Sequence, residues 1–77
     1  MTTAFNTEED YTEIPGKPKP MWRRRSISGF ALVSRSASGK WLWKAVPYDK
    51  ETSEEVSGTA INFGTAKSQA DLAIDNF

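Results

Sequence analysis

The last segment of the chain, TAKSQADLAIDNF (residues 65–77), restricts the fold more than any other part. Its apolar residues recur with the spacing of one face of an α-helix, and they are Ala66, Ala70, Ala73, Ile74 and Phe77. Alanines dominate this stripe, so the helix can approach another layer closely but adds little volume to a core. The larger core side chains must therefore come from the rest of the chain. Thr65 is the expected N-cap.

Three segments ahead of this helix have the composition of β-strands, at residues 26–35, 41–46 and 56–63. A small-residue turn, SASGK, separates the first two, and a charged stretch separates the second from the third. Pro47 should end the second strand, because a central strand needs its backbone donors. Such short links favour an antiparallel meander. The sequence therefore predicts an α+β fold, a three-stranded antiparallel sheet with one C-terminal helix on one face (βββα).

Residues 1–20 show neither a helical nor a strand period. Pro15, Pro18 and Pro20 deny this segment backbone donors and favour extended geometry. We therefore expect a flexible, acidic and proline-rich arm over residues 1–20, disordered or laid on the domain, and a single small domain over residues 21–77.

Several classes of site lack the residues that they need. The 77-residue chain has no cysteine and no histidine, which removes disulfides, thiolate nucleophiles, the commonest general base and the commonest zinc ligand. Acidic residues crowd the stretch 48–55, but a charged loop is usually a solvated loop. We find no nucleophile elbow, phosphate loop or metal-binding signature. We expect neither an enzyme nor a bound cofactor or metal.

The hydropathy pattern gives no sign of a membrane protein. No apolar run approaches the roughly 18 residues that a membrane-spanning helix needs. The first ten residues, MTTAFNTEED, are acidic and polar, whereas a secretory signal begins with a basic and then an apolar region. A cytoplasmic location is the resulting expectation.

Charge is unevenly distributed along a chain whose formal net charge is zero. Residues 1–20 carry four acidic and two basic side chains, and residues 45–77 carry six acidic and two basic ones. Residues 21–44 carry six basic side chains and no acidic one, a net charge of +6. This basic block favours a polyanionic partner such as DNA or RNA, although the overall neutrality argues against one.

The candidate nucleic-acid-binding residues are the cations of this block and two tryptophans: Arg23, Arg24, Arg25, Arg35, Lys40, Trp41, Trp43 and Lys44. Arginines contact phosphates and guanine in a bidentate manner and stack on bases. The arginine triplet could equally be a solubilising edge, or the partner of the acidic residues 8–10. Aromatic side chains on a basic sheet offer a stacking platform, whereas in so small a domain a tryptophan is more often packed in the core.

The order of features resembles a known group of DNA-binding domains. Gly39-Lys40-Trp41 in a turn, and a Phe-x-Thr-Ala-x-x-x-Ala pattern beginning at Phe63, are similar to AP2-like domains and to the arm-type domains of phage integrases. The similarity spans residues 23–77. It implies a three-stranded sheet with a C-terminal helix, the sheet lying in the DNA major groove. Contacts would then be expected from Arg25, Arg35, Lys40, Trp41 and Lys44.

Two functions of different class remain open at this point. The first is a small non-enzymatic module that binds nucleic acid through the basic first hairpin. The alternative is an accessory protein of a phage or mobile element that binds a host protein complex and inhibits or adapts it; such a protein could also form a homodimer through a sheet edge. The side of the sheet that the helix leaves open decides between a stacking and a core role for Trp41 and Trp43.

Overall fold

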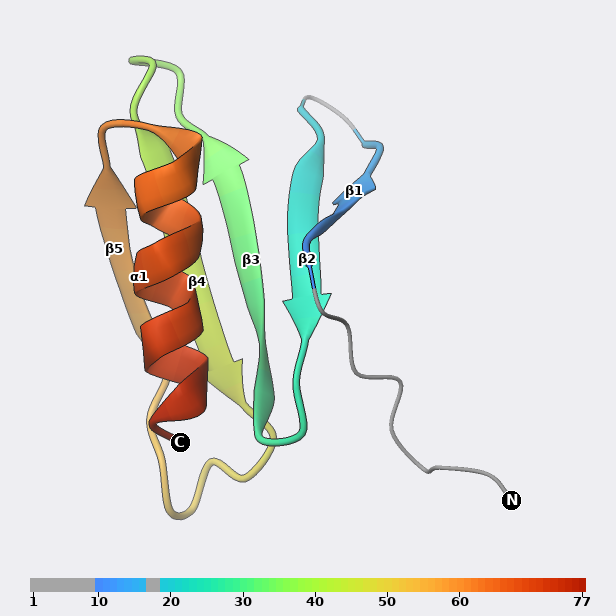
Figure 1. The fold of residues 1–77 in the computed structure, drawn as a ribbon, viewed down its shortest axis with the longest axis vertical. Coiled ribbons are helices and arrows are strands. Elements are labelled where there is room, and N and C mark those ends of the chain that lie inside the picture. The colour runs from blue at the N-terminus through green and yellow to red at the C-terminus, as the bar shows by residue number, and fades with distance from the viewer. Residues whose placement is uncertain (1–9, 17–18) are drawn as a thin grey trace.

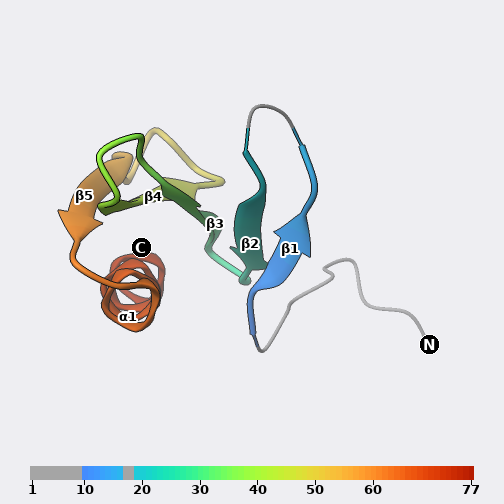
Figure 2. The ribbon, with the colours of Figure 1, turned by 90° about the horizontal axis from the view of Figure 1, so that it is seen from above.

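A computed structural model describes residues 10–16 and 19–77 of the chain. Within these residues, five antiparallel strands form one sheet, and a single helix lies across one of its faces (Figures 1 and 2). The elements are β1 (Thr12–Ile14), β2 (Met21–Arg25), β3 (Gly29–Arg35), β4 (Trp41–Pro47), β5 (Val56–Ala60) and α1 (Phe63–Asp75). Each strand pairs with its neighbours in the sequence, so the sheet is a continuous meander.

The predicted class, antiparallel order and C-terminal helix are confirmed, but the predicted number of strands is wrong. The sheet has five strands rather than three. The arginine triplet is itself part of a strand, β2. In this strand Trp22 and Arg24 point to one face of the sheet, and Met21, Arg23 and Arg25 point to the other. Both faces of β2 thus carry cations, which hides the alternation that identifies a strand.

Strand β1 lies inside the segment predicted as an arm. It spans three residues and pairs with β2 from Thr12 to Ile14, opposite Arg23 to Met21. A run this short carries almost no period, so pairing with β2 rather than local composition makes it a strand. The rest of the predicted arm falls mostly on residues 1–9 and 17–18, which lie outside the described part of the chain.

The first and third predicted strands differ from the observed ones at their ends. The first was expected to begin at Ser26, but the Ser26 amide donates to the Gly29 carbonyl at 2.7 Å and closes a tight turn. Ile27, at the tip of this turn, is 65% exposed. The third was expected to reach residue 63, but β5 ends at Ala60.

The helix begins three residues earlier than predicted. Asn62, not Thr65, is the N-cap, and its side-chain oxygen accepts from the Thr65 amide at 2.7 Å. This is the usual arrangement in which a cap side chain satisfies an N–H of the first turn. None of the helices in the described residues is long and apolar enough to cross a membrane.

The core lies between α1 and the centre of the sheet. The predicted apolar stripe of the helix is confirmed, since Ala66, Ala70 and Ile74 are fully buried. Ala31 and Ala45, which are cross-strand neighbours on β3 and β4, are also fully buried beneath them. Small residues on both layers let the helix lie close to the strands, as the alanine stripe requires.

Candidate nucleic-acid interface

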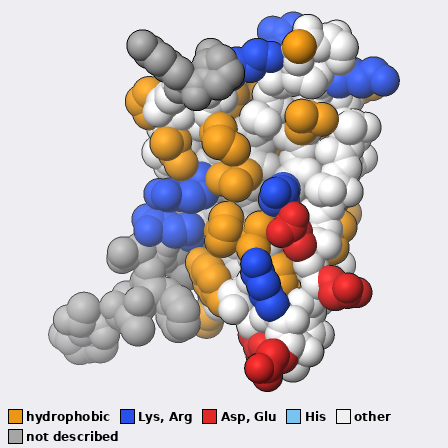
Figure 3. All heavy atoms as spheres, turned by 180° about the vertical axis from the view of Figure 1, so that it is seen from behind, with side chains coloured by type: hydrophobic (Ala, Val, Ile, Leu, Met, Phe, Trp, Pro, Cys, Tyr) orange, Lys and Arg blue, Asp and Glu red, His pale blue; other side chains and the backbone are white. Residues whose placement is uncertain are grey.

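The helix covers one face of the sheet and leaves the other open. Strand pairing assigns the residues of this open face, because directly opposed residues share a side. They are Met21, Arg23 and Arg25 on β2, Phe30, Leu32 and Ser34 on β3, Leu42, Lys44 and Val46 on β4, and Ser57 and Thr59 on β5. Figure 3 views the molecule from the side opposite to Figure 1, and there apolar and basic side chains intermingle.

Three of the predicted site residues, Arg23, Arg25 and Lys44, lie on the open face. Arg23, Leu32 and Lys44 are neighbours across three adjacent strands, and Arg25 lies opposite Phe30. The Lys44 ammonium is 3.3 Å from a carboxylate oxygen of Glu55, and both side chains are about half exposed. An exposed pair of this kind is weak, so the Lys44 charge can exchange partners at little cost.

Two further predicted residues lie at the turn between β3 and β4. Arg35 ends β3 and Lys40 immediately precedes β4, and the Ser36 amide donates to the Lys40 carbonyl at 2.7 Å. The turn contains Gly39 with a φ of 91°, a backbone conformation that favours glycine. The Lys19 ammonium donates to the Arg35 carbonyl at 3.1 Å. Three cations therefore gather at this end of the sheet.

Arg24 points away from the open face and belongs to the fold. Its guanidinium Nη1 lies 3.0 Å from Oδ1 of Asp71 on α1, and the Arg24 side chain is 21% exposed. The same carboxylate oxygen accepts from the Tyr11 hydroxyl at 2.9 Å. Asp71 thus links the helix to β2 through Arg24, and to the segment leading into β1 through Tyr11.

Trp41 and Trp43 lie on the face that the helix covers. The Trp41 ring packs against Trp22 and Phe63 with centroids 5.6 and 5.0 Å away. The Trp43 indole N–H donates to the Gln69 side-chain oxygen of α1 at 2.8 Å. All three tryptophans are partly buried, and they pack around the core rather than beside the cations of the open face.

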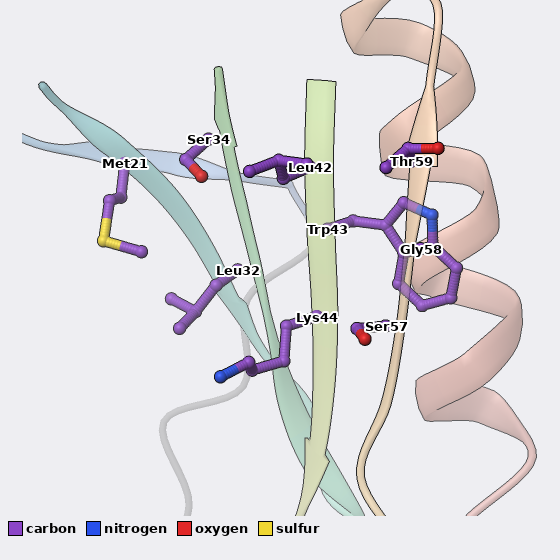
Figure 4. A pocket seen from close by; sticks show the side chains of 9 residues that line it. All are labelled: Met21, Leu32, Ser34, Leu42, Trp43, Lys44, Ser57, Gly58 and Thr59. Carbon is purple, nitrogen blue, oxygen red and sulfur yellow. The ribbon is translucent and has the colours of Figure 1, made fainter. Parts of the chain in front are cut away.

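Gly58 makes room for one of these rings. A Cβ at this position would lie 2.8 Å from Cζ2 of Trp43, which is closer than real Cβ atoms approach. The glycine therefore lets the indole lie close to the backbone of β5. Figure 4 shows Trp43 leaving β4 toward the helix, while Leu42 and Lys44 leave it on the opposite side.

A shallow hollow of about 430 Å³ lies on the open face. Met21, Leu32 and Leu42 give it an apolar floor, and Lys44 lies at its side (Figure 4). Within the described residues, no three acidic side chains lie close enough to hold a metal ion. The hollow offers a contact surface with hydroxyl and ammonium groups at its margin.

No pattern in the sequence predicts the contact between Tyr11 and Asp71. The Tyr11 hydroxyl is part-buried between the N-terminal segment and α1, and the Asp10 carboxylate lies 3.9 Å from the Lys67 ammonium beside it. Burial first, and then the hydrogen bond to Asp71, raise the pKa of Tyr11 well above its ordinary value near 10. Residues 60 positions apart in the chain form this contact, so local periodicity cannot reveal it.

Stability at alkaline pH should depend on Tyr11. Because its pKa is raised in the folded chain, the unfolded chain loses the phenolic proton first, and folding stability falls as the pH rises above about 10. Tyr11→Phe removes this titration. Denaturant titrations of both proteins from neutral to alkaline pH should show a steeper loss for the natural chain than for the variant. Equal losses would contradict a buried Tyr11 hydroxyl.

Comparison of the chain with models of known protein families, with curated proteins and with solved structures gave no match.

Proposed function

We propose that this chain is a small nucleic-acid-binding module that contacts the phosphate backbone with its open face and its β3–β4 turn. The observation that carries the proposal is the position of the cations. Arg23, Arg25 and Lys44 share the open face, and Arg35 and Lys40 lie at the adjoining turn. The Arg35 guanidinium lies 5.8 Å from the centroid of the Trp41 ring, on the side of the sheet that the helix covers. The positive surface therefore consists of Arg23, Arg25, Lys40 and Lys44, and such a cluster of cations is the electrostatic footprint of a polyanion binder.

Most of the acidic side chains in the described residues lie away from the cations of the open face, and Glu55, which is paired with Lys44, is an exception. Among the described residues, Asp71 and Asp75 lie on α1, and four acids lie in the loop 48–55 at the other end of the sheet from the β3–β4 turn (Figure 1). Glu13 is paired with Trp22 and so faces the helix side. The zero net charge of the chain is therefore the sum of two oppositely charged regions. For this reason the net charge does not argue against a nucleic-acid partner.

The packing of the tryptophans determines the mode of binding. Base stacking needs exposed rings, and Trp41 and Trp43 are engaged with Phe63 and Gln69 of the helix. Binding should then rest on phosphate contacts and show little preference for single strands over duplexes. The resemblance to AP2-like and integrase arm-type domains is consistent with this use of an open sheet face.

Removing the two open-face arginines should weaken binding and reduce its salt dependence. For Arg23→Ala with Arg25→Ala, we expect the slope of log K against log salt to fall by about 0.9 for each duplex phosphate that the variant no longer neutralises. Fluorescence anisotropy of a labelled duplex, titrated at several salt concentrations, measures both quantities. Absence of any binding by the natural chain at low salt would overturn the proposal.

A matched pair of lysines supplies the control. Lys40 at the β3–β4 turn and Lys50 in the loop 48–55 are both exposed, and each carries one positive charge. Lys40→Ala should weaken binding, whereas Lys50→Ala should leave it unchanged. Equal losses would mean that net charge alone governs binding, with no localised surface.

A second candidate function is binding of a protein partner, and the exposure of apolar side chains on the same face favours it. Met21 and Leu42 are 37% and 39% exposed there. An apolar contact would survive moderate salt, while phosphate contacts would not. The salt titration described above therefore separates the two candidates.

A further inference from the structure

The two edges of the sheet differ in how they are protected. Strand β1 forms one edge, and it is only three residues long, carries Glu13 and is followed at once by Pro15. Short length, charge and proline are the features by which natural sheets prevent an edge from pairing with another chain. The β1 edge is therefore closed to further strands.

Strand β5 forms the other edge and has none of these features. Its sequence, Val56-Ser57-Gly58-Thr59-Ala60, contains no charged residue and no proline, and it pairs with β4 on one side. The helix packs on β4 most and also on β3 and β5, so it lies over these strands rather than beyond this edge (Figure 2). The outward backbone groups of β5 can accept another strand.

We propose that β5 pairs with β5 of a second copy in antiparallel register, which joins the two sheets into one. A two-fold axis through Gly58 would place Ser57 opposite Thr59 of the second copy, and Val56 opposite its Ala60. Each pair occurs twice, as a two-fold contact requires. The sequence VSGTA is therefore complementary to itself in this register, which favours a second copy over an unrelated strand.

The side chains of β5 suit these pairs on both faces. Ser57 and Thr59 are exposed on the open face, where opposed hydroxyl side chains stabilise strand pairing. On the opposite face Val56 is 41% exposed, and an alanine from the second copy would cover part of it. Strand β5 itself carries no charged side chain, so the proposed pairs place no like charges opposite one another.

Sedimentation equilibrium of the full chain tests the proposal directly. We expect a concentration-dependent monomer–dimer equilibrium. The variant Ser57→Lys with Thr59→Lys places lysines opposite one another across the two-fold axis and should be monomeric, as should Ser57→Glu with Thr59→Glu. Mixing the two variants should restore a dimer that contains one of each, which also shows that both variants fold.

The control is Ser68→Lys with Leu72→Lys on the exposed side of α1, which adds the same charge and should dimerise like the natural chain.

The register can be checked by cross-linking, because the chain has no cysteine of its own. Under mild oxidation, Ser57→Cys mixed with Thr59→Cys should form the mixed disulfide faster than either variant forms a disulfide with itself. A natural chain that stays monomeric at all concentrations would overturn the proposal. So would dimers that persist in the lysine variant of β5, since those would use another surface.

Discussion

Replacing Ile74 by alanine should unfold a large fraction of the domain. Ile74 is fully buried and, with Val33, is one of the two largest side chains that are completely enclosed. Its neighbours in the core include Ala31, Ala45 and Ala70, which are too small to fill the space that it would leave. Removing a large aliphatic side chain from such a site costs about 2–5 kcal/mol. A domain of this size has a free energy of unfolding near the lower end of the usual range of roughly 5–15 kcal/mol.

Tryptophan fluorescence during denaturant unfolding measures this loss, because Trp43 packs against the core cluster that contains Ile74, and Trp22 and Trp41 pack against the adjoining cluster around Val33. Leu72→Ala is the matched control. Leu72 lies on the same helix, has the same number of carbon atoms as Ile74 and is 65% exposed. Its replacement should change stability by no more than about 0.5 kcal/mol. Similar losses for both variants would mean that α1 does not dock through the face that carries Ile74.

Replacing Gly29 by alanine is the second large effect that we expect. Gly29 is buried at the start of β3, where the chain passes close to β4. An added Cβ would overlap the carbonyl oxygen of Val46 and lie 3.0 Å from Cα of Pro47. Both are backbone atoms and cannot rotate aside, so the two strands would have to separate at this end. Overpacking of this kind costs about 1–3 kcal/mol or more.

Gly64→Ala provides the comparison for this variant. Gly64 lies in the first turn of α1, and the nearest atom to an added Cβ is Oδ1 of Asn62 at 3.6 Å, an ordinary contact. Alanine is favoured over glycine in a helix by up to about 1 kcal/mol. Thermal unfolding followed by circular dichroism should therefore show a lower Tm for Gly29→Ala and an equal or higher Tm for Gly64→Ala. A normal Tm for Gly29→Ala would contradict the close approach of β3 and β4.

The sequence predicts the parts of this fold that depend on local periodicity. The stripe containing Ala66, Ala70 and Ile74 identifies the helix and its buried face, and both are confirmed. The strand β2 escapes such reasoning because its arginines occupy both faces of the sheet. Asn62 lies inside the third predicted strand, residues 56–63, but its side chain caps the helix.

The open face could not be chosen from alternation alone, since both faces of β4 carry apolar residues. The size of the side chains decides it. The helix lies over the face with Gly29, Ala31 and Ala45, where there is room for a second layer, and the bulkier Phe30 and Leu32 are left on the other side. Trp41 and Trp43 are the large residues on this face, and they pack beside the small ones, against Phe63 and Gln69 of the helix.

The direction of α1 aligns its helix dipole with the separation of charge along the molecule. The helix starts at the end of the sheet that holds the β3–β4 turn and runs toward the acidic loop 48–55 (Figure 1). Its N-terminal turn carries no acidic side chain and its last turn no basic one, so its partial charges stay uncompensated by its own residues. The helix dipole therefore adds to the separation of charge between Lys40 at one end and the loop at the other. The field of the helix dipole is therefore positive at the end of the molecule that carries Lys40, and it adds to the attraction of that end for anions.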